Sequence, residues 1–312
     1  MISATLYSDA ACPWAYSESP ALRVLEWRYG DQLDWRLVMI GLSEDVSRYA
    51  SRGYTPLRGA LGQLSFRRYG MPFAPAPKER LSASARACRA VVAARLARPG
   101  SEWRVFRALQ LANFTTPLLL DDEAQLAELL RGVLGAGADT IIASLDDPAV
   151  TEAYERDRAE SRTAAGSPAE LQGKTAASDG PVRFTAPSVV FERDGVRLVA
   201  GGFQPVEAYD VLVANLDASI DRRGVPDTPA PLLENFPDGV TTQEVAAMLA
   251  DGNDAPDRVR AEAALLELVA AGEAVRVPLG DDALWRAPGG VEREDARELA
   301  FAGYPPPEEP AT

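Results

Sequence analysis

The residue best suited to chemistry is Cys12, a cysteine near the start of the chain. Residues 2–8 before it alternate in polarity as a short strand does, and residues 17–29 after it repeat apolar side chains at helical spacing. The thiol therefore falls between a strand and a helix start, where free N–H groups and the helix dipole favour the thiolate. The alternative interpretation is an inert loop cysteine, because structural cysteines are usually buried and unreactive.

The elements around Cys12 form a recognisable order. A second buried strand over residues 34–42 completes a strand–helix–strand unit, whose crossover is expected to be right-handed. A helical stretch follows at 81–165, after a Gly- and Pro-rich loop at 48–77 that holds at most one short helix. Further along we expect a flexible loop, two strands joined by the turn signal Asp194-Gly195, and a helix, at 173–181, 188–192, 196–200 and 205–219.

Residue counts exclude several kinds of site. The sequence has no histidine and two cysteines, Cys12 and Cys88. Catalytic triads that use histidine are therefore excluded, and two cysteines cannot complete a four-thiolate zinc site. We expect no metal, no tightly bound cofactor and no disulfide framework. The N-terminus has no signal-peptide pattern and no stretch reaches membrane-spanning length, so the expected location is the cytoplasm.

Three short motifs together resemble one family. They are the segment 8–16 around Cys-Pro-Trp-Ala, the pair Ala186-Pro187 before a strand, and the segment 201–207 that opens a helix. They resemble the DsbA-like thiol oxidoreductases, in particular the FrnE-like and 2-hydroxychromene-2-carboxylate isomerase branch. The resemblance covers about residues 1–218. It implies an α/β thioredoxin fold, βαβ-ββα, with an inserted α-helical subdomain.

The resemblance also implies roles for individual residues. Cys12 is the expected nucleophile, Trp14 would limit access to it, and Pro187 would be a cis-proline beside the sulfur. The Ala186 backbone would pair with a thiol-bearing substrate as a short strand addition. The residues expected to bind the substrate or thiol are Pro13, Trp14, Ala15, Ala186, Pro187 and Gln204.

The departure from the family pattern concerns Ala15, which occupies the place of the usual second cysteine. A lone thiol cannot complete a dithiol cycle by itself. We therefore expect a monothiol oxidoreductase, or a thiol-dependent transferase or isomerase of a small electrophile, that works with a low-molecular-weight thiol. The alternative is a non-catalytic binding or regulatory protein. Cys88 is a candidate second thiol, although its helical stripe with Ala85 and Val92 favours a core position.

The identity of that thiol is suggested only by base composition. Lys78 and Lys174 are the two lysines among 32 basic residues, and this arginine bias is typical of GC-rich bacterial genomes. Mycothiol is then an expected co-substrate beside glutathione.

The net charge differs strongly between the last 80 residues and the rest of the chain. From residue 233 to the end there are 17 acidic and 6 basic residues, which leaves 29 acidic and 26 basic before it. The acidic part resembles a winged-helix-like α+β unit, but its charge disfavours DNA binding. The expected partners are a small thiol or electrophile and a second copy in a homodimer, with no nucleic acid and no membrane. The expected domains are the two thioredoxin parts 1–80 and 173–225, the helical insertion 81–172, the linker 226–232, the winged-helix-like unit 233–290 and the tail 291–312.

Overall fold

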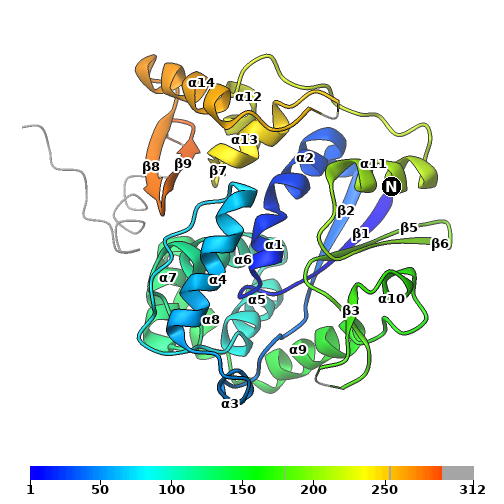
Figure 1. The fold of residues 1–312 in the computed structure, drawn as a ribbon, viewed down its shortest axis with the longest axis vertical. Helices are drawn as coiled ribbons and strands as arrows, with labels where there is room; N and C mark the ends of the chain where they lie inside the picture. Colours follow the sequence, from blue (N-terminus) through cyan, green and yellow to red (C-terminus); the bar gives the residue numbers. More distant parts are fainter. Residues whose placement is uncertain (179, 253, 290–312) are drawn as a thin grey trace, which may run out of the picture.

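The computed structural model describes residues 1–178, 180–252 and 254–289. Its central element is a four-stranded sheet in the order β2-β1-β5-β6, in which β1 pairs parallel with β2 and antiparallel with β5. The strands are β1 (Ile2–Ser8), β2 (Leu33–Met39), β5 (Ser188–Arg193) and β6 (Val196–Gly201). The order βαβ, helical insert and ββα confirms the expected thioredoxin-like fold (Figure 1).

The first helix differs from its expected bounds. The sequence predicts one helix over 17–29, and the structure has α1 (Pro13–Ser17) and α2 (Ser19–Tyr29), with Glu18 between them. Pro20 explains the break, because it has no N–H to continue the helical hydrogen-bond ladder. The segment that follows Cys12 is consequently only five residues long before the axis is interrupted.

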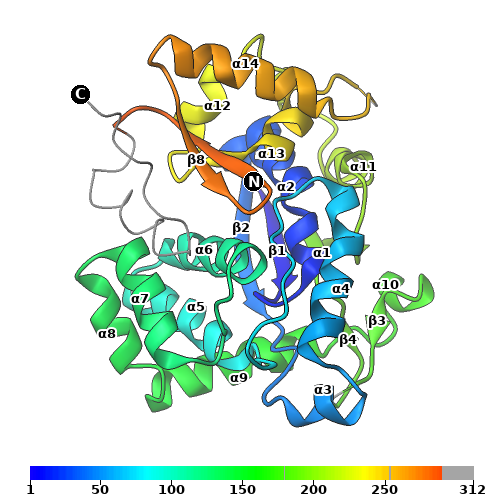
Figure 2. The same ribbon diagram turned by 60° about the vertical axis from the view of Figure 1, so that its left-hand side comes forward.

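The helical insert packs on the face of the sheet near β2. Its helices are α5 (Ala85–Ala97), α6 (Ser101–Thr115), α7 (Glu123–Leu134), α8 (Gly137–Ala143) and α9 (Pro148–Ser161). One hydrophobic core runs from the sheet into these helices, from Leu6 and Leu37 to Val91 and Leu109. The insert is therefore part of the same folded body as the sheet, as Figure 2 also shows for α5 to α9.

The prediction for residues 48–77 was largely wrong. This stretch holds the short α3 (Ser47–Ser51), the eleven-residue α4 (Pro56–Phe66) and a 3-10 turn, η2 (Arg67–Tyr69). Thr55 caps α4 by accepting a hydrogen bond from the backbone N–H of Arg58, and Pro56 suits the first helical position. Gly59 and Gly62 lower the helix propensity of the segment, which is why its pattern indicated a loop.

The second half of the sheet follows the expected hairpin. Asp194 and Gly195 join β5 to β6 with φ of 51° and 78°, the left-handed conformations that a two-residue hairpin turn requires. The helix after it is α11 (Val206–Leu216). The expected flexible loop 173–181 contains one short strand, which pairs with a second short strand after the loop, and a short helix precedes the loop. These elements are α10 (Pro168–Leu171), β3 (Thr175–Ala176) and β4 (Arg183–Phe184).

The C-terminal unit combines three helices with a three-stranded sheet in the order β7-β9-β8. Its elements are α12 (Ala230–Asn235), β7 (Val240–Thr241), α13 (Thr242–Met248), α14 (Arg258–Ala270), β8 (Val275–Leu279) and β9 (Asp282–Arg286). Thr241 and Glu244 form the capping box that the sequence indicates at the start of α13. The winged-helix likeness stays a prediction, and the expected tail, 291–312, lies outside the described residues.

The C-terminal unit is not separated from the rest by a free linker. Its helix α12 starts inside the expected linker 226–232, and Val24 and Trp27 of α2 belong to the same hydrophobic core as Leu233 and Phe236. Figures 1 and 2 both place α12 to α14 over α2, at one end of the molecule. None of the described helices is long and apolar enough to span a bilayer.

Candidate active site

Cys12 is the N-cap residue of α1 and follows the last residues of β1. Its backbone is extended, with φ of −83° and ψ of 114°, and its N–H donates to the carbonyl oxygen of Asp9 at 3.2 Å. The residue is only 6% exposed, so the sulfur lies below the surface. The predicted position between strand and helix is thus correct, whereas the exposure expected of an attacking thiol is small.

The Cys12 thiol lies against the loop before β5. Its Sγ donates a hydrogen bond to the carbonyl oxygen of Ala186 at 3.2 Å, across 174 residues of sequence. The peptide bond between Ala186 and Pro187 is cis, the conformation that the family resemblance implies there. The fold therefore brings the cysteine and the proline loop together as the motifs suggest.

The protonation state of Cys12 is opposite to the expected one. Burial raises the pKa of its thiol to about 12, and the charge of Asp9 raises it further, against the lowering effect of backbone N–H groups of Ala15 and Trp14. The helix that should stabilise a thiolate is the five-residue α1, whose dipole is small. In this state the thiol is protonated at neutral pH and serves as a hydrogen-bond donor.

An aromatic cluster surrounds Trp14 beside the cysteine. The Trp14 ring is 40% exposed and meets the rings of Phe66, Tyr69 and Phe203 at centroid distances of 4.9, 5.6 and 5.6 Å. Phe66 and Tyr69 come from α4 and η2, in the segment that the sequence indicates as loop. The cluster covers the approach to α1, and only Trp14 among its members was predicted.

The remaining predicted residues lie in the elements around the thiol. Pro13 opens α1, and Ala15 is buried where a second cysteine would stand. The Gln204 side chain donates to the carbonyl oxygen of Gly201 at 2.7 Å, within its own loop. In this structure its amide therefore shapes the loop beside β6.

Glu18 is a buried carboxyl group that sequence reasoning missed. Its Oε1 accepts hydrogen bonds from the Tyr209 hydroxyl at 2.6 Å and the Gln204 backbone N–H at 3.3 Å. Its Oε2 has no hydrogen-bond partner among the described residues. Burial raises the pKa of Glu18 to about 8, more than these two hydrogen bonds lower it.

Asp9 is the second buried carboxylate that the motifs did not indicate. It accepts hydrogen bonds from the backbone N–H groups of Ala11 and Leu42 at 2.8 and 2.7 Å and from the Ser84 hydroxyl at 2.9 Å. Burial raises its pKa. Its position three residues before Cys12 at a strand end is the one sequence signal that could have marked it.

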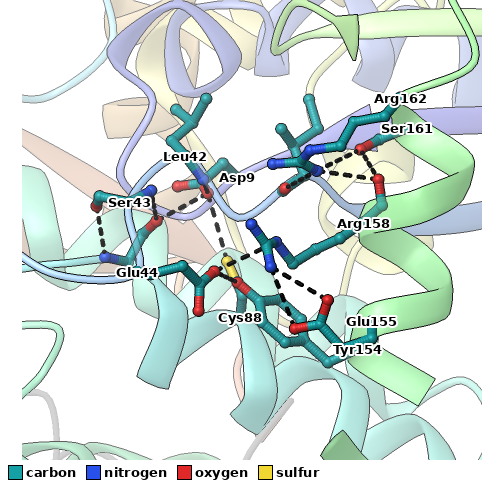
Figure 3. Close-up of polar contacts among 12 residues, drawn as sticks. Asp9, Leu42, Ser43, Glu44, Cys88, Tyr154, Glu155, Arg158, Ser161 and Arg162 are labelled. Atoms are coloured by element: carbon teal, nitrogen blue, oxygen red, sulfur yellow. Dashed lines mark hydrogen bonds and ion pairs between the residues drawn. The ribbon is translucent and has the colours of Figure 1, made fainter. Parts of the chain in front are cut away.

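Cys88 lies in α5 on the inner side of this carboxylate. Its sulfur donates to Asp9 Oδ2 at 3.4 Å, as Figure 3 shows, and the residue is fully buried. Burial raises the pKa of the Cys88 thiol well above its ordinary value. Both cysteines are free thiols. These contacts fit the core-filling interpretation of Cys88 better than a role as a second reactive thiol.

Metal chemistry has no visible basis in the described part of the chain. Within residues 1–178, 180–252 and 254–289, no group of three or more Cys, Asp or Glu side chains is placed to hold a metal ion.

Comparison with known proteins agrees with this architecture. The model of the DSBA-like thioredoxin domain family matches residues 5–184, more than half of the chain. No curated protein matches the sequence.

Solved structures share the fold at low sequence identity. A Streptomyces coelicolor protein described as a DsbA oxidoreductase is 18% identical, with a TM-score of 0.52 over 73% of this chain and 94% of that one. A Nitrosomonas europaea protein described as a candidate protein disulfide isomerase is 17% identical, with a TM-score of 0.51 over 69% and 96%. The cytosolic disulfide reductase DsbM from Pseudomonas aeruginosa is 21% identical, with a TM-score of 0.48 over 70% and 100%.

Proposed function

Because the chain belongs to the DSBA-like thioredoxin domain family, we propose that it is a thiol-dependent enzyme in which Cys12 is the sole nucleophile. Its partner is a low-molecular-weight thiol, which takes the place of the second cysteine that Ala15 replaces. The substrate is a disulfide or a small electrophile whose reacting atom can reach the buried sulfur.

One observation carries this proposal. The Cys12 sulfur is hydrogen-bonded to the Ala186 carbonyl oxygen beside cis-Pro187. A substrate that pairs with the Ala186 backbone as an added strand would hold its own sulfur next to this thiol. Position and alignment of the two sulfurs are what disulfide exchange requires from a protein.

The proposed reaction is an exchange without net oxidation. The Cys12 thiolate attacks one sulfur of a substrate disulfide, forms a mixed disulfide and releases the other half as a thiolate. The thiolate of a small thiol then attacks the substrate sulfur of the mixed disulfide, which forms a new disulfide and returns the Cys12 thiolate. With an electrophilic substrate, the Cys12 side chain instead orients the small thiol, whose thiolate adds to the electrophilic carbon while a proton from water completes the addition.

The hydrogen bond between the Cys12 thiol and Ala186 affects the pKa of the thiol. The hydrogen bond to Ala186 stabilises the protonated form, and a hydrogen bond to the neutral form raises the pKa. A substrate that occupies the Ala186 carbonyl removes this acceptor. The N–H groups of Trp14 and Ala15, which lower the pKa, then act on a sulfur that has lost its acceptor. Loss of this acceptor on substrate binding would therefore shift the thiol toward the thiolate, while burial, the largest cause of the raised pKa, still opposes it.

Glutathione and mycothiol are the co-substrates that we propose, and the reducing cytoplasm is the compartment that supplies them. The absence of a disulfide framework in the sequence supports this placement.

A second function is favoured by the buried state of the sulfur. A thiol that is 6% exposed, with a pKa near 12, suits a binding or regulatory protein that has kept the fold without turnover. In that case a ligand would bind beside cis-Pro187, and Cys12 would contribute only a contact to it.

Mixed-disulfide capture separates the two functions. The folded protein is mixed with glutathione disulfide or mycothiol disulfide, and intact mass and peptide mapping locate the adduct. The Cys88→Ala variant leaves Cys12 as the only thiol, and Cys12→Ala is the matched control. The enzyme proposal expects one adduct, at Cys12, that free thiol removes. An adduct that forms only after unfolding in urea would instead support the binding protein.

A further inference from the structure

A cavity of about 400 Å³ lies between the helical insert and the C-terminal unit. Its wall comes from α6, from the loop 116–119 after it, from α7 and from the β8–β9 hairpin. Figures 1 and 2 both place this hairpin above α6 and α7. The volume is within the range of pockets that bury a ligand.

The wall of this cavity includes residues that solvent reaches. Glu79 and Pro117 are exposed, and the side chains of Arg104 and Asp238 are 38% and 43% exposed. These four residues come from four separate segments of the chain. Because exposed residues surround it on several sides, the cavity opens to solvent between them.

The inner wall of the cavity is a gap between two hydrophobic clusters. Leu111 of α6 and Leu279 and Leu284 of the hairpin belong to one cluster, which also holds aromatic rings from the loop before α5. Leu129 and Val133 of α7 pack against the main core instead. Apolar side chains placed in the cavity would join the two clusters and remove both surfaces from water.

Polar groups on the wall are already paired with their neighbours. The Thr115 and Thr116 hydroxyl groups each donate to a main-chain carbonyl oxygen one turn earlier in α6, at 2.7 Å. The Gln125 Oε1 accepts from a backbone N–H of the loop 116–119 at 2.9 Å. An occupant therefore gains its binding energy mainly from its own apolar surface.

The described part of the chain ends beside this cavity. Arg286 of β9 lines the cavity, and the description ends three positions later, at Gly289. Residues 290–312 follow in the sequence. Ten further residues extend at most about 33 Å. The chain around residue 299 can therefore reach the cavity that lies next to its own attachment point.

One part of residues 290–312 has the composition that this cavity requires. Residues 299–304, Leu-Ala-Phe-Ala-Gly-Tyr, carry no charged side chain, whereas 291–298 and 305–312 together hold six acidic residues. Segments that stay solvated are poor in aromatic and bulky apolar residues. Leu299, Phe301 and Tyr304 depart from that composition, and an apolar surface would cover them.

We propose that residues 299–304 dock in the cavity of the same chain, with Leu299 and Phe301 against its apolar wall. The tether from Gly289 holds the segment at an effective concentration of about 1 mM, so a weak intrinsic affinity is enough for occupancy. Docking connects α7 to the β8–β9 hairpin and thereby the helical insert to the C-terminal unit. The cavity contains no residue of the proposed active site, so the inference holds whether or not Cys12 turns over a substrate.

Photo-crosslinking of the full chain tests where the segment lies. In this experiment p-benzoylphenylalanine replaces Phe301, dilute protein is irradiated, and peptide mapping locates the product. We expect cross-links within one chain to α6, α7 or the β8–β9 hairpin. Leu129→Asp places a charge on the cavity wall and should lower their yield about tenfold or more. Leu171→Asp, at a position 88% exposed on α10, is the matched control and should leave the yield unchanged.

A titration measures the affinity of the segment for the cavity. In the double variant Leu299→Ser with Phe301→Ser, a synthetic peptide of residues 290–312 should bind with a Kd of about 0.1 mM. Wild type should bind this peptide about tenfold more weakly, because its own segment competes at an effective concentration of about 1 mM. A peptide that carries both serine replacements is the matched control and should not saturate either protein.

Several results would overturn docking within the chain. Cross-links that join two copies would assign the cavity to the segment of a second copy, and cross-links spread over the surface would leave the segment without a site. Equal peptide binding by wild type and the double variant, or no saturation by either, would contradict occupancy. Circular dichroism checks the folding of each variant, and if Leu129→Asp does not fold, the wild-type cross-link map and the titration decide without it.

Discussion

Burial and local hydrogen bonding have opposite effects on the protonation state of the Cys12 thiol. Burial and the nearby Asp9 carboxylate favour the protonated thiol, while the N–H groups of Ala15 and Trp14 favour the thiolate. The pKa near 12 shows that burial is the stronger effect in the substrate-free protein. Position at a helix start alone therefore does not make this thiol a thiolate, and under the proposed function a bound ligand has to change its surroundings.

Glu18 makes stability depend on pH in a predictable direction. An exposed glutamate ionises near pH 4.3, whereas the pKa of folded Glu18 is about 8, because burial opposes its charge. The stabilisation from this raised pKa is fully present below the unfolded value and is lost as pH rises through the folded value. Between the two, wild-type stability should fall by about 1.4 kcal/mol per pH unit relative to Glu18→Gln.

Urea unfolding at several pH values between about 5 and 8, roughly the window between the two pKa values, measures this difference. Glutamine can still accept from Tyr209 and Gln204, so the variant keeps both contacts. Glu207→Gln on the exposed start of α11 controls for the loss of a surface carboxyl group. Parallel curves for wild type and Glu18→Gln would contradict a raised Glu18 pKa.

Sequence reasoning could locate a site residue only where its role depends on local sequence and on order along the chain. Cys12 and Ala186-Pro187 carry their signal in local sequence and in their order along the chain. Glu18 carries no such signal and Asp9 carries only its place at a strand end before Cys12, because the effect of both comes from burial among distant segments such as Leu42, Ser84 and Tyr209. Burial of a carboxyl group is a property of tertiary structure, and no local pattern encodes it.

At the scale of elements, a buried ion pair between Arg107 on α6 and Glu244 on α13 links the helical insert to the C-terminal unit. Burial would raise the pKa of Glu244, but the charge and hydrogen bonds of Arg107 outweigh it and hold the pKa at about 2. Arg107→Met would leave the fully buried carboxylate with only the more distant cation of Arg23, 3.9 Å away. We expect a loss of about 3–5 kcal/mol in the free energy of unfolding.

Arg104→Met is the matched control on the same helix. Arg104 also pairs with an acidic residue of the C-terminal part, Asp238 at 2.8 Å, but both side chains are more than a third exposed. Its loss should cost about 1 kcal/mol or less, because surface pairs are screened by water. Equal losses in the two variants, measured by urea unfolding, would show that burial does not set the strength of this link.

The elements that sequence reasoning located best are those with a repeated pattern and a clear end. The β5–β6 hairpin follows from two alternating strands around Asp194-Gly195. The break at Pro20 was missed because the apolar repeat continues through it, and α12 was missed because prolines around it indicate a linker. The break at Pro20 is a local effect of its missing N–H, whereas at α12 tertiary packing selected a conformation that local propensity leaves open.

At the scale of the whole molecule, the acidic C-terminal part and the nearly neutral thioredoxin part form one packed body. Val24 and Trp27 complete the core of the C-terminal unit, and Arg107 crosses to Glu244. The difference in net charge along the sequence indicates a domain boundary near residue 233, but residues from both sides of it pack in one hydrophobic core. The C-terminal unit thus supports α2 and α6, the helices that contact α1.

The central claim, that Cys12 alone carries thiol chemistry in this chain, is tested most directly by turnover. The rate of hydroxyethyl disulfide reduction is measured with glutathione and with mycothiol for wild type, Cys12→Ala and Cys88→Ala. We predict that Cys12→Ala loses about 100-fold or more of the protein-dependent rate, as expected for a nucleophile, and that Cys88→Ala stays within about twofold. A wild-type rate no higher than that of Cys12→Ala with both thiols would contradict the account.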